Sequence, residues 1–374
     1  MNKKTFFQVL RRWPIYLWFH AKGVRPGRWD RLYGYIKHDF FKYKETSFKQ
    51  KLWAYKRGFL SEEIKRYGLN EDNYKNYISS FDYFKKSAYV NERFDYWFND
   101  KLTTWFVLHP FLNCMPEHYY FIGKNQVREL GKTQNAKDSI EGVVELLIDK
   151  GKLAMKETRG SHGSGFTKLT HNDGEFKINN KVASLIEVKD AIKNSNDYIV
   201  TEYVEDHPEI SKIYSMSKSG IEGLTPGVMR VITVYDETKG AQIIGAAMRL
   251  GSKKSGLLTD YDGALYAGIR METGELFRPL INVGSFGTKP CEQHPDTGVT
   301  IEGMKVPNWT ELVTKVVEIS NYLSNTPHLT FDIVMSKNGM KILEINSHGL
   351  VRTYQTYYPF FENESARKLF KPKG

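Results

Sequence analysis

The sequence is poor in cysteine and lacks long apolar runs. Only 2 of its 374 residues are cysteines, too few for a disulfide framework or a four-thiolate zinc site, so the composition suits a reducing compartment. No uninterrupted apolar stretch reaches the ~18 residues of a membrane-spanning helix, and no apolar segment precedes a small-residue cleavage site. We therefore expect a cytoplasmic protein and exclude a secreted disulfide scaffold. With 40% hydrophobic and 26% charged residues, the chain is expected to fold into several globular lobes.

Acidic residues are scarce in residues 1–60 alone. This stretch has 15 Lys and Arg against 3 Asp and Glu, while the rest of the chain has 39 against 40. The net charge of +11 therefore comes from one sixth of the sequence, which also carries sixteen aromatic residues. Pro14, Pro26 and three glycines interrupt residues 1–45. We expect a basic-aromatic arm that is irregular or consists of short helices.

Several partners suit such an arm. Lys and Arg interleaved with Trp and Phe fit an anionic membrane surface, where aromatic rings settle among the headgroups and each cation adds ~1 kcal/mol. A carbohydrate or a polyprenyl-linked sugar is a second candidate. The aromatics could instead pack under the rest of the protein as core. Nucleic acid is a further alternative, although no recognisable base-reading motif accompanies the charge.

The remainder divides into three parts by its local patterns. Residues 61–135 have helical spacing, with Asp100 as the expected N-cap of one helix, and form an abbreviated, mainly helical N-terminal lobe. Residues 136–206 turn to strand patterns around a glycine-rich loop and form a small lobe. Residues 207–374 form a large lobe that ends in a hairpin and a short tail.

Strand patterns dominate the second half of the chain. They cover residues 152–156, 198–203, 228–235, 242–250, 330–335 and 340–345. A helix is expected over residues 309–323, and the turn Asn338-Gly339 joins the last two strands. Strand pairs joined by turns, with helices between them, favour an α+β fold of antiparallel sheets over a doubly wound parallel sheet.

A glycine-rich segment, RGSHGSGF at residues 159–166, separates two expected strands. Glycines let backbone N–H groups approach phosphate oxygens closely, so the segment is a candidate phosphate cover. It is neither a Walker A loop, which ends in Gly-Lys-Ser/Thr, nor a Rossmann fingerprint that opens a helix. A flexible turn without a ligand is the alternative.

Three oxygen-bearing side chains fall on the last expected hairpin. Asp332 lies on one strand, and Glu344 and Asn346 lie on the returning strand. Carboxylate and amide oxygens are ligands for hard cations such as Mg²⁺, and the apolar neighbours on both strands would hold them rigidly. The alternative is a surface hairpin with an acidic face, but surface strands seldom place acids between such apolar neighbours. The pattern predicts a metal site.

Two lysines and one strand end complete a candidate nucleotide site. Lys156 precedes the glycine-rich loop, and Lys101 follows the expected helix cap. Each could neutralise phosphate charge, although a lone lysine is more often a solvated surface residue. Residues 202–204 end an apolar strand and could offer backbone hydrogen bonds to an adenine edge.

The chain resembles the ATP-grasp superfamily over residues ~95–352. The resemblance rests on the order of its features along the chain: a lysine, a lysine with a glycine-rich loop, a Glu-x-Val segment, two arginine-bearing strands, an Asp and a Glu-x-Asn. The chain is most similar to the sugar-transfer-associated ATP-grasp proteins, related to α-L-glutamate ligases, in GALYAGI at 263–269, HPDTG at 294–298, FD at 331–332 and LEINS at 343–347. It is also similar to ribosomal-protein glutamate ligases in RV at 230–231, AMR at 247–249 and NSHGL at 346–350. The resemblance implies two α+β lobes that hold ATP between antiparallel sheets.

The same resemblance implies a role for each candidate residue. The nucleotide-binding set is Lys101, Lys156, the loop residues Gly160, Ser161, His162, Gly163, Ser164 and Gly165, and the adenosine contacts Glu202, Tyr203 and Val204. The ligands of two Mg²⁺ ions are Asp332, Glu344 and Asn346. Arg230 and Arg249 match arginines beside the transferred phosphate and the acyl group. His348 is expected to contact substrate or act as a general base, with a structural hydrogen-bonding role as the alternative.

The resemblance implies an ATP-dependent carboxylate–amine ligase that works through an acyl phosphate and releases ADP, and these residues suit that mechanism. Cations would neutralise the phosphates and an arginine the oxyanion, so no nucleophilic side chain is required. By resemblance alone, we expect one substrate to be a saccharide of a cell-surface polysaccharide, such as a capsule, or of its precursor, at the inner membrane face. The alternatives are a catalytically degenerate ATP-grasp protein recruited to membrane glycan machinery and a basic nucleic-acid-binding protein.

Overall fold

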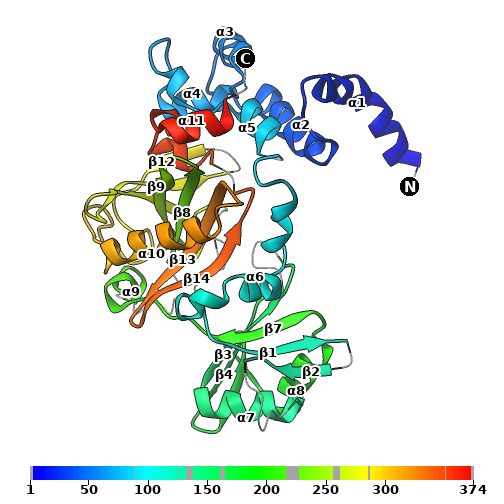
Figure 1. The fold of residues 1–374 in the computed structure, drawn as a ribbon, viewed down its shortest axis with the longest axis vertical. Helices are drawn as coiled ribbons and strands as arrows, with labels where there is room; N and C mark the ends of the chain where they lie inside the picture. Colours follow the sequence, from blue (N-terminus) through cyan, green and yellow to red (C-terminus); the bar gives the residue numbers. More distant parts are fainter. Residues whose placement is uncertain are drawn as a thin grey trace.

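The computed structural model consists of a helical N-terminal region and two lobes, each built on one sheet (Figure 1). In Figure 1 the helical region lies at the top with both chain ends, the large lobe in the middle and the small lobe at the bottom. The structure describes residues 3–87, 89–124, 126–131, 138–160, 165–215, 227–255, 262–284, 287–349 and 351–371, with the backbone alone for residues 3–11.

Helices form the N-terminal region, as the sequence indicates. They are α1 (Lys3–Ala21), α2 (Pro26–Phe41), α3 (Phe48–Lys56), α4 (Ser61–Tyr67) and α5 (Ser80–Lys86). The first two are longer than the short pieces expected for residues 1–45, and two of the interrupting residues stand at helix boundaries. Pro26 occupies the first turn of α2, where its missing N–H is not needed. Gly23, with φ of 83°, makes the left-handed turn that separates α1 from α2, whereas Pro14 lies inside α1.

A short 3-10 helix, η1 (Tyr74–Asn76), lies between α4 and α5. Three further helical segments lead from this region to the sheets, and they are η2 (Glu92–Trp97), α6 (Lys101–Val107) and η3 (His109–Cys114). Asp100 is the N-cap of α6, as expected, because its side chain accepts a hydrogen bond from the backbone N–H of Thr103 at 2.8 Å. This cap fixes the place where the chain begins α6, with Lys101 as the first helical residue.

The small lobe is a seven-stranded sheet in the order β2-β1-β7-β3-β4-β5-β6. Its strands are β1 (His118–Gly123), β2 (Gln126–Glu129), β3 (Lys152–Glu157), β4 (Thr167–Asn172), β5 (Glu175–Ile178), β6 (Lys181–Ala183) and β7 (Tyr198–Glu202). The helices α7 (Ile140–Lys150) and α8 (Leu185–Asn194) pack on it. Val143 and Leu147 of α7 and Val188 of α8 are buried against Leu153 and Met155 of β3, which closes the core of this lobe.

The strands β1 and β2 belong to this sheet although they precede residue 136, where the sequence patterns place the start of the small lobe. We propose that the lobe begins at His118 instead. β1 is short, and it pairs with β2 on one side and, on the other, with β7 at the far end of the lobe in sequence. Local spacing carries no sign of the pairing with β7, which places β1 and β2 in this sheet.

The large lobe is a second seven-stranded sheet, in the order β12-β11-β10-β9-β8-β13-β14. Its strands are β8 (Val228–Asp236), β9 (Gly240–Leu250), β10 (Leu265–Ile269), β11 (Leu276–Val283), β12 (Gly287–Pro290), β13 (His328–Ser336) and β14 (Gly339–Asn346). The helix α10 (Trp309–Tyr322) packs on β8 and β9, and α9 (Pro208–Ser215) precedes the sheet. The strand pairs formed by the described residues of both sheets are antiparallel, which confirms the α+β class.

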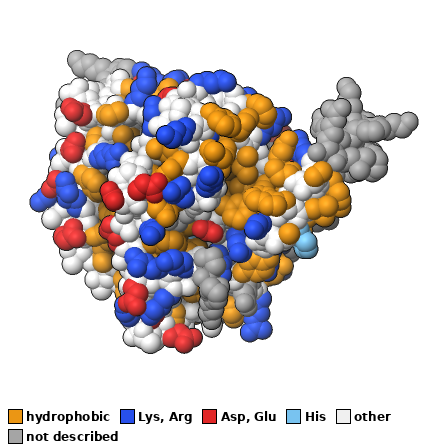
Figure 2. Space-filling view, turned by 90° about the horizontal axis from the view of Figure 1, so that it is seen from above, with side chains coloured by type: hydrophobic (Ala, Val, Ile, Leu, Met, Phe, Trp, Pro, Cys, Tyr) orange, Lys and Arg blue, Asp and Glu red, His pale blue; other side chains and the backbone are white. Residues whose placement is uncertain are grey.

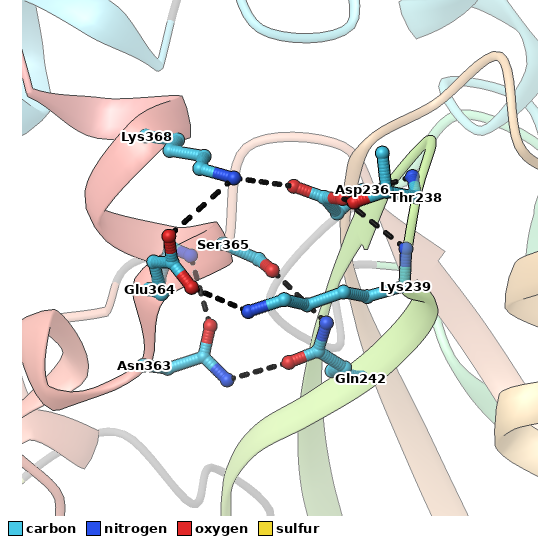
Figure 3. Close-up of polar contacts among 9 residues, drawn as sticks. Asp236, Thr238, Lys239, Gln242, Asn363, Glu364, Ser365 and Lys368 are labelled. Atoms are coloured by element: carbon cyan, nitrogen blue, oxygen red, sulfur yellow. Dashed lines mark hydrogen bonds and ion pairs between the residues drawn. The ribbon is translucent and has the colours of Figure 1, made fainter.

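The C-terminal segment fastens to the large lobe through η4 (Tyr354–Thr356), η5 (Phe360–Glu362) and α11 (Glu364–Phe370). Figure 3 shows the polar contacts between the start of α11 and the β8–β9 hairpin. Gln242 donates to the Ser365 hydroxyl and accepts from the Asn363 amide, both at 2.9 Å. The Nζ atom of Lys368 lies 3.7 Å from Oδ2 of Asp236. These contacts hold the C-terminal helix beside the helical N-terminal region (Figure 1).

Candidate active site

A cleft lies between the two sheets, with about 410 Å³ of empty volume, part of which is open to solvent. The small lobe contributes Lys156 of β3 and Thr201 of β7, and the large lobe contributes Glu344 of β14. Lys101 of α6 and His118 of β1 line it as well. Three residues predicted from widely separated motifs, Lys101, Lys156 and Glu344, therefore line one cleft.

The two lysines form a strongly cationic wall of the cleft. Burial and, to a smaller extent, the nearby charge of Lys101 lower the pKa of Lys156 to about 8, while the charge of Glu344 opposes both effects. Lys101 donates from Nζ to the Gly160 carbonyl at 2.7 Å. This contact brings a cation to the start of the glycine-rich loop, where a polyanion would relieve the repulsion between the lysines.

The described ends of the glycine-rich loop lie between β3 and β4. Gly165 has a φ of 69°, and a Cβ at this position would come within 2.6 Å of the Glu157 side chain, so only glycine fits without a shift. Gly160 forms the other end. Ser161, His162, Gly163 and Ser164 lie outside the described residues, and their phosphate contacts stay a prediction.

The hairpin of β13 and β14 places the two predicted carboxylates side by side. Asp332 pairs directly with Glu344 across the strands, and Asn346 lies two residues beyond Glu344, on the same face of β14. Burial raises the pKa of Glu344, and the adjacent Asp332 carboxylate raises it further. A raised pKa of this origin indicates a carboxylate pair that a cation would stabilise.

Two arginines from neighbouring strands hold Asp332 in its charged form. Arg230 of β8 donates from Nε and Nη2 to the two Asp332 oxygens at 2.6 and 2.7 Å, and Arg249 of β9 lies 3.0 Å from Oδ2. Burial alone would raise the pKa of Asp332, but the charges and hydrogen bonds of both arginines bring it below its usual value. The predicted catalytic arginines therefore reach the predicted metal site through Asp332.

The donor set of this hairpin fits a hard divalent cation. Asp332 and Glu344 supply carboxylate oxygens, Asn346 supplies an amide oxygen, and this chemistry is what Mg²⁺ prefers. Within the described ranges, no group of three or more His, Cys, Asp or Glu side chains could hold a metal ion. The predicted set contains two carboxylates and one amide, so further ligands would come from substrate phosphates and water.

Residues 202–204 begin at the last residue of β7 and directly follow Thr201, which lines the cleft, but they are not among its lining residues. The Glu202 carboxylate accepts from the Glu117 backbone N–H at 3.2 Å and lies 3.6 Å from Lys341 Nζ. Tyr203 lies under Lys168, whose Nζ is 4.7 Å from the ring centre. Val204 packs against Leu343, which lines the cleft. The segment therefore connects the two lobes beside the candidate nucleotide site.

His348 is not among the residues that line the cleft. Its Nε2 lies 2.8 Å from Oδ2 of Asp95 in η2, and its Nδ1 lies 2.9 Å from the Ser347 carbonyl. The partner Asp95 comes from the helical N-terminal region and fixes the orientation of the ring. His348, a predicted catalytic residue, is thus tied to the N-terminal region.

His118 is a cleft residue that the sequence motifs do not indicate. It is buried, its Nδ1 lies 2.7 Å from the Pro116 carbonyl, and its ring stacks on Trp105 with centroids 5.8 Å apart. Burial lowers the pKa of His118 to about 4, so the side chain is neutral near pH 7. A single histidine on a short strand carries no motif, and no signal in the sequence could have found it.

The segment after the hairpin is fastened to the N-terminal region at several points. Tyr83 donates to the Gly349 carbonyl at 2.5 Å, and Asn91 donates to the Ser347 carbonyl at 3.0 Å. Gln355 accepts from the Ile78 backbone N–H at 2.7 Å. The helical region thereby supports the loop that directly follows the candidate metal ligands.

Three solved structures are similar to this chain at low sequence identity. D-alanyl-alanine synthetase A of Vibrio cholerae has a TM-score of 0.38 and 12% identity over 73% of this chain and 65% of that chain. The ATP-grasp ligase PsnB, complexed with minimal precursor, has a TM-score of 0.39 and 11% identity over 75% of this chain and 63% of that chain. The ADP complex of N5-carboxyaminoimidazole ribonucleotide synthetase has a TM-score of 0.36 and 10% identity over 69% of this chain and 49% of that chain. This chain therefore spans about two thirds or less of each.

The sequence itself gives the decisive match. No curated protein matches the chain, but the family model described as sugar-transfer associated ATP-grasp matches residues 82–358. This range is about three quarters of the 374 residues and contains both sheets, the cleft and the β13–β14 hairpin. The two lobes thus form an ATP-grasp fold, and the chain belongs to the sugar-transfer associated ATP-grasp family.

Proposed function

We propose that this protein is an ATP-dependent carboxylate–amine ligase that forms ADP and phosphate. The observation that carries the proposal is the convergence of Lys101, Lys156 and Glu344 on one cleft between the lobes, with Asp332 beside Glu344. A carboxylate oxygen of the donor would attack the γ-phosphorus and release ADP. The amine would then attack the acyl carbonyl and release phosphate. Both steps develop negative charge, which this set of cations is suited to stabilise.

The cations of the cleft bind and orient the phosphates in this proposal. Lys156 is held in a partly buried place where its charge is costly, so binding of a polyanion is favoured there. Lys101, at the start of α6 and against Gly160, would place its charge under the glycine-rich loop from Gly160 to Gly165. The loop would exclude water from the reacting phosphate.

The hairpin residues would hold two Mg²⁺ ions. Asp332, Glu344 and Asn346 are the proposed ligands, and when bound the ions supply positive charge against the phosphate oxygens. Arg230 and Arg249 keep Asp332 ionised. In this proposal they would also stabilise the oxyanion that forms on the acyl group. Because Asp95 fixes its ring, we propose that His348 positions a substrate rather than acting as a nucleophile.

The substrate class follows from the family rather than from the cleft. We propose that one substrate is saccharide-linked, that the reaction modifies a cell-surface polysaccharide, such as a capsule, or its precursor, and that the protein works as a peripheral protein at the cytoplasmic face of a membrane. The match to a sugar-transfer associated family supports the saccharide. No helix within the described residues is long and apolar enough to cross a membrane.

The test is a screen of ADP and phosphate release over candidate acids and amines, including sugar acids and amino sugars. Products are identified by mass spectrometry and nucleotides by chromatography. ADP and phosphate formed in step with an amide support the proposal. Stoichiometric AMP would contradict the acyl-phosphate mechanism. ATP binding without turnover of any pair would favour the catalytically degenerate alternative.

A further inference from the structure

Part of the basic-aromatic stretch is core, as one of its alternatives states. Tyr16, Phe19, Val24, Leu32 and Phe84 form a buried cluster between α1, α2 and α5. The Tyr16 ring stacks on Trp29 with centroids 5.3 Å apart, and Trp29 Nε1 donates to the Val24 carbonyl at 2.8 Å. These contacts account for the inward faces of the helices and for why α1 and α2 pack together.

The outward faces of the same helices carry large apolar side chains. They are Trp13, Leu17 and Trp18 on α1, Phe40 and Phe41 at the end of α2, and Phe48 and Leu52 on α3. Phe41 is 63% exposed and Phe48 is 70% exposed. Several large apolar groups in one short stretch exceed the scattered exposure that a soluble surface normally shows.

Cations surround these apolar groups. Among the described residues 12–60, the exposed Lys and Arg are Lys22, Arg25, Arg31, Lys37, Lys42, Lys44, Lys49 and Lys56, and the exposed acids are Asp30 and Glu45. Both acids pair with a base, Asp30 with Arg12 at 3.0 Å and Glu45 with Lys65 at 3.2 Å. The surface therefore presents a positive charge that few acids offset.

Some of the exposed groups follow the helical repeat. On α2 Lys37 and Phe41 lie one turn apart on one face, and on α3 Phe48 and Leu52 do the same. Figure 2 looks down on this region, and on the right of the view orange and blue side chains lie interspersed, while most of the red ones lie on the left. Apolar and cationic groups thus share a surface.

Buried polar contacts attach this surface rigidly to the protein body. Lys51 donates from Nζ to the carbonyls of Asp39, Phe40 and Tyr43 at 2.5, 2.9 and 2.8 Å, which ends α2 and fixes α3 against it. The Asp39 carboxylate accepts from the backbone N–H groups of Ser61 and Glu62 at the start of α4. α4 is in turn paired with the segment after the hairpin through Glu62 and Arg352.

We propose that the outward faces of α1, α2 and α3 form a docking surface for an anionic lipid bilayer. Cations are drawn to anionic headgroups while Trp and Phe enter the headgroup level, and together these terms bind a protein without a spanning helix. A second copy would bring a like-charged surface, which repels. Leu17 and Leu52 have no ring to stack on a base, so nucleic acid uses this surface less well. The inference does not depend on the ligase reaction.

The test is co-sedimentation of the full chain with phosphatidylcholine vesicles, with and without about 30% phosphatidylserine. We expect binding to the anionic vesicles alone. The variants W13A/L17A and F41S/F48S should each lower the partition coefficient at least tenfold, because each loses more than two methylenes at ~0.8 kcal/mol per buried CH₂. The matched control is V182S/I186S on the small lobe, whose side chains are 68% and 72% exposed and which should bind like the parent chain.

Charge is tested separately with K37Q/K44Q/K49Q, where each lost cation should weaken binding about fivefold, the equivalent of ~1 kcal/mol. The proposal is overturned if the parent does not sediment with anionic vesicles, or if the control variant loses as much binding as the two apolar variants. It is also overturned if W13A/L17A changes the sedimentation-velocity mass without changing vesicle binding, which would assign the surface to a second copy. An oligonucleotide bound more tightly than the vesicles, through the same lysines, would overturn it in favour of nucleic acid.

Discussion

In the β13–β14 hairpin, charged side chains face one another inside the protein, whereas on α1, α2 and α3 the cations face solvent. Asp332 is 7% exposed and is held by Arg230 and Arg249, while the lysines of the helical surface have two exposed acids among the described residues 12–60. Buried, paired charges interact strongly with a small polyanion in one geometry. Exposed charges of one sign interact weakly and additively with an extended anionic surface.

The comparison implies that a carboxylate matters for different reasons at different sites. In the hairpin, Asp332 forms ion pairs with Arg230 and Arg249, whereas the pKa of Glu344 is raised by burial and by the charge of Asp332. The loss of the two carboxylates should therefore have different effects. In the helical region, Asp39 is a buried hydrogen-bond acceptor and Asp30 is a surface partner. Four substitutions separate these roles, from the largest expected effect to the smallest.

The largest effect is expected for Asp332→Asn. The substitution leaves Arg230 and Arg249 buried without their carboxylate, so the free energy of unfolding should fall by ~3–5 kcal/mol. Urea denaturation measures it. The control is Asp262→Asn in the same lobe, whose exposed pair with Lys254 should matter little. If both variants unfold at the same urea concentration as the parent, the arginine cluster does not stabilise the lobe.

Glu344→Gln should abolish turnover while it leaves stability nearly unchanged. The variant keeps the shape of the side chain but removes one charge where phosphate charge develops, so kcat should fall about 10²–10³-fold. Kinetics with a confirmed substrate pair, together with circular dichroism, measure both quantities. Turnover within tenfold of the parent would remove Glu344 from the proposed metal site.

Asp39→Asn should destabilise the helical region by ~1–3 kcal/mol, because some of its donors lose a charged acceptor in a buried place. The donors are the Ser61 and Glu62 backbones, the Ser61 hydroxyl and the Tyr55 hydroxyl. Asp30→Asn, on the same helix, is the control and should change the unfolding curve little. Equal stability of the two variants would mean that Asp39 does not organise the docking surface.

The smallest effect concerns the pH dependence of ATP binding. The pKa of Lys156 is about 8, so the charged form that attracts phosphate is complete below that pH and is lost as the pH rises through it. Affinity for ATP should fall about tenfold from pH 7 to pH 9, measured by calorimetry with proton uptake on binding. Lys156→Arg keeps its charge over this range and should remove the dependence. A parent chain with constant affinity would show that Lys156 does not contact the phosphates.

Particular residues show how far the sequence reached. The hairpin, its turn and the cap at Asp100 follow from local spacing, and the structure has all three. The ion pair of Asp332 with Arg230 was not indicated, because it depends on β8 lying beside β13, and the two strands are far apart in the chain. The places of His118 and Asp95 in the site were not predicted for the same reason. Each acquires its neighbours only when the N-terminal region, the small lobe and the large lobe come together.

The sequence by itself determined the strand and helix patterns, the α+β class, the family and the unequal distribution of charge, because these depend on residue type and on neighbours a few positions away. Only the tertiary structure decided that Lys101, Lys156 and Glu344 line one cleft, and that Phe19 is buried while Phe41 and Phe48 face outward. The physical reason is that spacing along the chain sets which residues share a face. Which of those faces become covered depends on the packing of elements that are distant in sequence.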